Sequence, residues 1–147
     1  MKKRQLIITQ ADHQRLVELT RGARLDPRLG AEALAALNAL DAELWSARRV
    51  SPGDVPPDVV TMNSVVRIRD LDTGDADDYE LVYPAHADIE RNRISVLAPI
   101  GTAILGYRIG DVIQWPVPAG VCRLQIEDVL YQPERAAFAG EMAGAGT

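Results

Sequence analysis

Apolar residues in the first 50 positions recur with the period of an α-helix. Leu16 and Leu19 belong to an apolar stripe, and either Thr9 or Asp12 is placed to cap the helix that carries it. A capping side chain accepts hydrogen bonds from the N–H groups that lack partners in the first helical turn. This pattern predicts a first helix that ends before a loop at residues 22–30.

A second helical segment follows that loop, in which Asp26-Pro27 disfavours helical backbone. Residues 31–44 are rich in strong helix formers. Apolar residues at intervals of 4, 3 and 4 share one face, as in a seam between two helices: Ala33, Leu37, Leu40 and Leu44. We therefore predict an antiparallel helical hairpin over residues 1–50. Its second helix is expected to be about 20 residues and about 30 Å long, and its first helix shorter.

Beyond a proline-rich linker at residues 51–57, the apolar period changes from helical to alternating. Val66 and Ile68 alternate with two arginines, which predicts a strand with one buried face. A turn at residues 72–75 and a return strand at 79–83 complete a first β-hairpin.

A second β-hairpin is predicted from residues 112–117 and 122–129, with Cys122, Leu124 and Ile126 on the face toward the core. Between the two hairpins lies a segment that fits a short helix beginning at a proline. The predicted fold class is therefore α+β, with an antiparallel sheet domain that includes this short helix. The predicted units are the helical hairpin (1–50), the linker (51–57), the sheet domain (58–133) and a flexible tail (134–147).

Charge and composition narrow the class of protein. The net charge of −5 argues against a general nucleic-acid binder, and no apolar run is long enough to cross a bilayer. Residues 1–28 hold seven bases and three acids, whereas the remainder holds nine bases and 18 acids, an asymmetry typical of two structural units. The single cysteine excludes an internal disulfide and fits a protein of the reducing cytoplasm.

Candidate chemistry is sparse. His13, His86 and Cys122 lie far apart in the sequence and lack the close ligand pairs of a zinc site. Ser64 and Ser95 lack the strand-turn-helix setting of a nucleophilic serine, and no phosphate-binding glycine motif is present. We therefore predict no enzyme activity, no metal and no cofactor.

An acidic run contains no base and offers oxygen ligands for a divalent cation, although it lacks the spacing of a calcium loop. A solvated hairpin tip is the favoured interpretation, because acidic residues are common in turns. The run consists of Asp70, Asp72, Asp75, Asp77, Asp78 and Glu80.

The glycine-rich segment from Ile94 to Asp111 carries almost no reactive group. Its elements occur in the same order and at similar spacing in the C-terminal domain of Gre factors: Ile94–Gly101, Ala103–Gly106, Gly110–Asp111 and Pro118–Gly120. The segment from Leu6 to Leu16 resembles the start of the Rnk proteins. The chain thus resembles the Rnk proteins, called regulators of nucleoside diphosphate kinase, within the Gre transcription-factor superfamily.

The resemblance implies an FKBP-like C-terminal domain that docks on RNA polymerase near the rim of its secondary channel. Gre factors insert a longer helical hairpin, whose acidic tip reaches the catalytic magnesium and stimulates RNA cleavage. Here the predicted hairpin is shorter, and its tip offers Asp26 and Glu32 rather than a close acidic pair. The resemblance therefore implies a competitor or modulator at the docking site of Gre factors that does not stimulate cleavage. From the net charge and the lack of a long apolar run, we predict no sequence-specific nucleic-acid partner and no membrane partner.

The expected polymerase contact is a surface turn that presents a small apolar knob, with arginines around it that add charge complementarity. The knob residues are Ala98, Pro99, Ile100 and Gly101, and the arginines are Arg91, Arg93 and Arg108. The same segment leaves Ile104 and Leu105 open to interpretation as contact or core residues.

Two alternatives remain at this stage. An FKBP-like fold suggests a peptidyl-prolyl isomerase, although fold alone is a poor guide to activity and the one phenylalanine, Phe138, lies in the predicted tail. The family name suggests a direct regulator of nucleoside diphosphate kinase, for which the sequence shows no nucleotide-binding motif.

Overall fold

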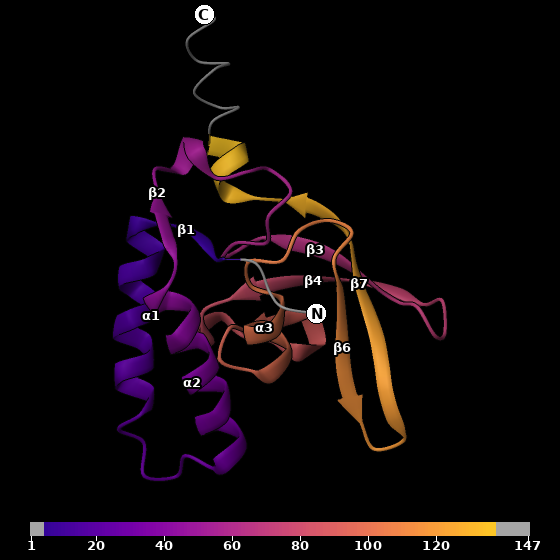
Figure 1. The fold of residues 1–147 in the computed structure, drawn as a ribbon, viewed down its shortest axis with the longest axis horizontal. Coiled ribbons are helices and arrows are strands. Elements are labelled where there is room, and N and C mark those ends of the chain that lie inside the picture. The colour runs from indigo at the N-terminus through magenta and orange to yellow at the C-terminus, as the bar shows by residue number, and fades with distance from the viewer. Residues whose placement is uncertain (1–4, 138–147) are drawn as a thin grey trace, which may run out of the picture.

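The computed structural model describes residues 5–137, apart from the side chains of Pro116 and Val117. Its first helix, α1 (Gln10–Ala23), and its second, α2 (Ala31–Trp45), form the predicted hairpin (Figure 1). Thr9 caps α1, because its hydroxyl accepts a 3.2 Å hydrogen bond from the backbone N–H of Asp12. Phe138 lies outside the described residues.

The hairpin is shorter than the sequence predicted. The helix α2 has 15 residues and α1 has 14, so α2 is about 22 Å long and the two helices are nearly equal. The Ser46 hydroxyl donates to the Ala42 carbonyl at 3.2 Å, and the chain then leaves the helix as a strand. Leu37, Leu40 and Leu44 are buried as predicted, but Ala33 is exposed because it lies near the loop end of the hairpin.

A parallel strand pair at the base of the hairpin was not predicted. It joins β1 (Ile7–Thr9) to β2 (Arg48–Val50), with Ile7 opposite Arg48. Each strand has three residues, which is too short for an alternating pattern to be recognised, and the partners are distant in sequence. The pair holds the start of α1 beside the end of α2.

The second half of the chain forms a five-stranded sheet in the order β5-β4-β3-β7-β6. All neighbouring strands are antiparallel except β4 and β5, which are parallel, so the expectation of a purely antiparallel sheet is wrong. The missed strand, β5, is short and follows a loop with two 3₁₀ turns. The strands are β3 (Val65–Asp70), β4 (Ala76–Val82), β5 (Arg93–Ser95), β6 (Val112–Val117) and β7 (Gly120–Tyr131).

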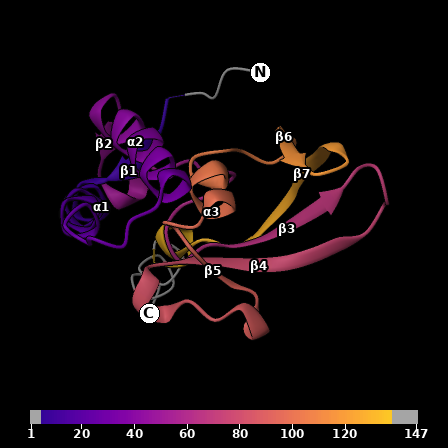
Figure 2. The ribbon, with the colours of Figure 1, turned by 90° about the horizontal axis from the view of Figure 1, so that it is seen from below.

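The sheet curls around a short helix, α3 (Pro99–Ile104), which lies between the sheet and the hairpin (Figure 2). One apolar core joins the three parts, since Leu16 of α1, Leu40 of α2 and Ile104 of α3 all belong to it. Val66 and Ile68 are buried as the alternating pattern predicted. Ile104 and Leu105 are completely buried, so both are core residues rather than surface contacts.

The end of the sheet domain is tied to the segment before β3. Gln132 donates to the carbonyl oxygens of Pro56 and Val59, at 2.8 and 2.9 Å. The Thr61 hydroxyl donates to Oε2 of Glu134 at 2.8 Å. Residues 133–137 are helical and Glu134 is buried, where the sequence suggested the beginning of a flexible tail. No helix within residues 5–137 is long and apolar enough to span a membrane.

Candidate functional site

The candidate site is a groove of about 640 Å³ between α2 and α3. One wall is the face of α2 that points away from the hairpin core, where three alanines lie between two glutamates. Because alanine side chains are short, this wall leaves room for side chains of another molecule. The residues that α2 contributes are Glu32, Ala35, Ala36, Ala39 and Glu43.

The opposite wall comes from α3 and from the segment that follows it. The expected contact residue Pro99 lies in this wall and is exposed. The aromatic side chains of Tyr107 and Trp115 close one side of the groove, and Trp115 comes from β6. The smaller residues of this wall are Thr102 and Ala103. The groove thus pairs a small-residue helix face with two aromatic side chains.

The segment expected to form a surface turn is the first turn of α3. Pro99 occupies the beginning of the helix, where its missing N–H costs nothing, and Ala98 precedes it in extended conformation. Ala98 and Ile100 are half-buried, and Ile100 packs against the core. The expected knob is therefore limited to the exposed Pro99 and parts of its two neighbours.

Gly101 is buried and has a packing role. A Cβ atom at this position would lie 2.9 Å from the carbonyl carbon of Ser95 and 3.1 Å from Cα of Val96. The Thr102 hydroxyl donates to the Val96 carbonyl at 2.6 Å, which holds α3 against the same backbone. The glycine therefore lets α3 approach the end of β5 closely.

The three expected arginines do not gather at the groove. Each forms an ion pair with a carboxylate outside the groove. None of the three is among the described residues that line the groove walls. The pairs are Arg91 with Asp88 at 3.7 Å, Arg93 with Glu80 at 3.8 Å, and Arg108 with Asp58 at 3.8 Å.

The two acidic residues near the hairpin tip lie in different surroundings. The Asp26 carboxylate accepts hydrogen bonds from the backbone N–H of Arg28 at 2.9 Å and from its guanidinium at 3.3 Å. Glu32 lies in the first turn of α2 and lines the groove. The structure therefore assigns the two carboxylates different surroundings, and the neighbouring Leu25 is 83% exposed at the tip.

Sequence reasoning missed most of the groove. Tyr107 and Trp115 carried no signal, since a single aromatic residue in a strand or loop has no characteristic spacing. The α2 wall did have a recognisable pattern in the sequence, because Ala35, Ala36 and Ala39 share one helix face with Glu32 and Glu43. A small-residue face opposite the leucine seam is thus visible in the sequence, but its partner wall is not.

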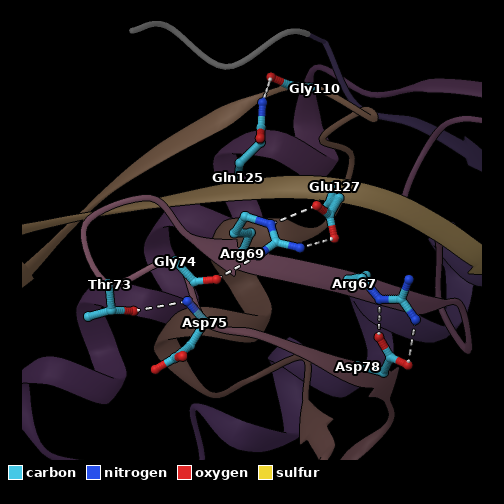
Figure 3. A network of polar contacts seen from close by, with 9 residues as sticks. All are labelled: Arg67, Arg69, Thr73, Gly74, Asp75, Asp78, Gly110, Gln125 and Glu127. Carbon is cyan, nitrogen blue, oxygen red and sulfur yellow. Dashed lines mark hydrogen bonds and ion pairs between the residues drawn. The ribbon is translucent and has the colours of Figure 1, made fainter.

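Two cross-strand ion pairs lie on the outer face of the sheet, and one of them uses Asp78 of the acidic run (Figure 3). Arg67 of β3 binds Asp78 of β4 through two hydrogen bonds, at 2.9 and 3.3 Å. Arg69 binds Glu127 of β7 in the same way, at 2.7 and 3.1 Å. The hydrogen bond from Arg69 is the first cause of the lowered pKa of Glu127. These bidentate contacts tie β3 to both of its neighbours.

One group in this region has the composition of a metal site. The ligand atoms of Asp70, Asp72 and Cys122 lie within 4.8 Å of one another. The Cys122 thiol donates to Asp70 at 3.2 Å, a contact that raises the pKa of the thiol and lowers that of the carboxyl. Asp72 accepts from Arg123 at 3.0 Å. Because these oxygen atoms are already engaged, the arrangement favours a role in joining the β3–β4 turn to β7.

Comparison with known proteins adds to this geometry. A helical hairpin lies beside a curled sheet, and the groove lies between α2 of the hairpin and α3. Residues 55–131 match the family described as "Transcription elongation factor, GreA/GreB, C-term". The chain therefore belongs to the GreA/GreB family, and its predicted resemblance to the Rnk proteins and the Gre superfamily is confirmed.

Individual relatives support the same assignment. The chain is 45% identical over 117 residues to the regulator of nucleoside diphosphate kinase of Escherichia coli strain K12, covering 77% of this chain and 86% of the relative. It is 34% identical over 90 residues to transcription elongation factor GreA of Clostridium novyi, covering 61% of this chain and 57% of the relative.

A solved structure, the prokaryotic transcription elongation factor GreA/GreB from Nitrosomonas europaea, superimposes with a TM-score of 0.73 and 38% identity. The superposition covers 86% of this chain and 99% of that one. The match extends beyond residues 55–131, so it includes part of the helical region as well.

Proposed function

We propose that this chain is a non-enzymatic transcription regulator that binds RNA polymerase near its secondary channel and competes there with Gre factors. Membership of a family whose named members are transcription elongation factors supports the polymerase as partner. The observation that carries the proposal is the groove between α2 and α3, because the expected contact residue Pro99 lies in it. A cytoplasmic location is part of the same proposal.

The groove suits a docked protein element. Its alanine wall admits apolar side chains, Tyr107 and Trp115 offer large apolar surfaces, and aromatic residues are frequent at the energetic centres of interfaces. Glu32 and Glu43 add carboxylates to the α2 wall, which favours a partner surface with basic groups. The site residues that we propose for polymerase contact are thus centred on Pro99, with Ala98 and Ile100 beside it.

Gly101 and the three expected arginines are not proposed as direct packing contacts with the polymerase. Gly101 supports the contact indirectly, because it positions the start of α3. Arg91, Arg93 and Arg108 lie outside the groove. They contribute to association through their charge rather than through direct packing.

The absence of cleavage stimulation is proposed from the length and tip of the hairpin. The helix α2 is about 22 Å long, so the tip of the hairpin lies close to its base. The Asp26 carboxylate is bound by Arg28 within the loop, and Glu32 lines the groove. This arrangement does not present two adjacent carboxylates to a shared metal ion.

The curled sheet around α3 is also the basis for proposing an FKBP-like domain, but not an isomerase. The cavity on the inner face of the sheet, about 340 Å³, has Tyr79 as its single aromatic lining residue within the described part of the chain. Asp70, Asp75 and Asp77 also line this cavity. These carboxylates make the cavity a poor site for the apolar side chain of a proline substrate.

Direct regulation of nucleoside diphosphate kinase is a second candidate, because the 45% identical relative carries that name. Co-elution of the two purified proteins during gel filtration tests it. Separate elution at micromolar concentrations would leave the polymerase as the proposed partner.

RNA cleavage in stalled elongation complexes tests the main proposal. The chain alone is expected to leave the transcript intact, and in excess it should slow the cleavage that an added Gre factor stimulates. Shortened transcripts with the chain alone would contradict the proposed lack of stimulation. Unchanged Gre-dependent cleavage at saturating chain would contradict competition.

A further inference from the structure

The outer edge of β2 has no paired strand within residues 5–137. In the parallel β1–β2 pair, the N–H of Arg48 donates to the Leu6 carbonyl at 2.8 Å, so the backbone groups of Arg48 face β1. Alternate residues of a strand direct their backbone groups to opposite edges, and the N–H and C=O of Arg49 therefore face outward. No hydrogen-bond partner for these two groups is found within residues 5–137. The edge can accept another strand.

An exposed tryptophan and an apolar groove lie beside this edge. Trp45, the last residue of α2, is 93% exposed, the highest exposure among the large apolar side chains that the structure describes. It borders a groove of about 730 Å³ between α1 and α2, to which Val17 and Ala42 also contribute. An aromatic residue of this kind commonly anchors an interface when a partner covers it.

The same surface is basic, although the whole chain carries a net charge of −5. Arg21 and Arg49 line the groove and Arg48 lies on the edge, and all three are exposed. No ion pair of these arginines is found among the described residues. Asp41 is the one carboxylate among the described residues that line this groove, and Arg24 already binds it. The unpaired charge on this surface is therefore positive.

We propose that the β2 edge binds an extended, acidic segment of a partner protein, which adds to the β1–β2 pair as a third strand. The backbone of that segment hydrogen-bonds to Arg49. Because Arg48 and Arg49 project to opposite faces of β2, carboxylates on both faces of the segment pair with the arginines, and one apolar side chain on the groove face packs on Trp45. The three observations point to one occupant, because an open edge selects a polypeptide, the arginines select negative charge, and the tryptophan selects an apolar side chain.

This surface is distinct from the proposed polymerase groove. It uses Asp41, Ala42 and Trp45 of α2, whereas the other groove uses the face that carries Ala35 and Ala39. Figure 2 shows the β1–β2 pair beside the helices, at the end of the molecule away from the β3–β4 turn. The inference therefore stands independently of the proposed function, and both surfaces can be occupied together.

Synthetic peptides test the proposal with the full chain. A peptide of glutamates around one central valine is titrated into ¹⁵N-labelled protein, and the amide signals of residues 48–50 and the indole signal of Trp45 are followed. We expect saturable shifts at these positions with a dissociation constant below about 1 mM. A second peptide, N-methylated at alternate residues, keeps the charge but lacks donors for strand pairing. A third replaces each glutamate with lysine.

Substitutions separate the edge from general charge. Trp45→Ala and Arg49→Glu should each weaken binding of the acidic peptide by about fivefold or more. Arg28→Glu is the matched control, because its side chain is 89% exposed at the hairpin tip and it makes the same change in net charge. Unchanged circular dichroism spectra establish that the variants are folded.

Several results would overturn the proposal. These are the absence of shifts at about 1 mM peptide, equal binding of the N-methylated or lysine peptide, or equal loss of binding in Arg28→Glu. A single-stranded DNA oligonucleotide that shifts the same signals at lower concentration would assign the surface to nucleic acid instead. Self-association that sedimentation detects and Arg49→Glu abolishes would assign it to a second copy of the chain.

Discussion

The hydroxyl of Tyr83 donates a 2.9 Å hydrogen bond to Oδ1 of Asp12, and this bond joins the sheet domain to the first helix of the hairpin. The guanidinium carbon of Arg15 lies 4.1 Å from the centre of the same ring. Burial, together with the nearby Asp12 carboxylate, raises the pKa of Tyr83, so its hydroxyl stays protonated and able to donate near neutral pH. The orientation of the hairpin thus depends in part on one side-chain contact.

Replacing this tyrosine should loosen the junction without opening the core. Tyr83→Phe keeps the ring but removes the donor, so we expect the free energy of unfolding to fall by about 1 kcal/mol. Denaturant unfolding measures the change. Tyr79→Phe is the control, because the described residues hold no hydrogen-bond partner for the Tyr79 hydroxyl. Equal losses in the two variants would contradict a specific role for the bond to Asp12.

Gly101 and Gly22 should respond in opposite directions to the same substitution. Gly101→Ala places a methyl group against the backbone of Ser95 and Val96, and we expect a loss of at least about 2 kcal/mol. Gly22→Ala, within α1, meets no atom within 4 Å and removes conformational freedom from the unfolded chain. It should increase stability by about 0.5 kcal/mol. Thermal unfolding of both variants provides the measurement, and a stable Gly101→Ala would contradict the close approach of α3 to β5.

The sequence was informative where one element carries its own pattern. The spacing of Leu37, Leu40 and Leu44 predicted α2, and the alternation at Val66 and Ile68 predicted β3. Both patterns arise from a single amphipathic segment that buries one face.

What the sequence did not reveal depends on segments that meet only in the folded chain. The β1–β2 pair, the parallel partner β5 and the wall that Trp115 adds to the groove involve residues that are distant along the chain. Pro99 was predicted as a contact residue through a family resemblance, whereas the placement of Gly101 in the core required the actual backbone distances.

Glu134 makes stability dependent on pH. Its side chain is 7% exposed. Burial raises its pKa, which the hydrogen bond from Thr61 only partly offsets. Between the ordinary pKa and the raised one, the folded state holds more protons than the unfolded state. The contribution of Glu134 to the free energy of unfolding therefore falls as pH rises through this window.

Glu134→Gln should remove this dependence. The stability of the variant relative to the parent is expected to increase as pH rises above the ordinary carboxyl pKa of Glu134, because only the parent loses stability there. Thermal unfolding at a series of pH values measures the difference. Glu18→Gln is the control, because it removes an exposed carboxylate from α1 and shows how the loss of one negative charge alone changes stability. A difference that stays constant or decreases with rising pH would show that burial of Glu134 does not perturb its titration.

Filling the groove between α2 and α3 should weaken polymerase binding selectively. Ala39 is exposed in the α2 wall, so Ala39→Arg adds a long side chain with little effect on helix stability. We expect about tenfold weaker binding, equivalent to about 1.4 kcal/mol. Gln14→Arg adds the same charge at an exposed position of α1 outside the groove and should bind normally. Equal affinities of the two variants in a filter or anisotropy assay would exclude the groove as the contact.

The most direct test of the account is displacement of a fluorescently labelled Gre factor from core RNA polymerase of the same organism, measured at two salt concentrations. The account predicts complete displacement by the chain, with weaker binding at the higher salt because charged groups contribute to docking. No displacement at saturating chain, or simultaneous binding of both proteins, would contradict the proposal that this chain competes with Gre factors for a shared site.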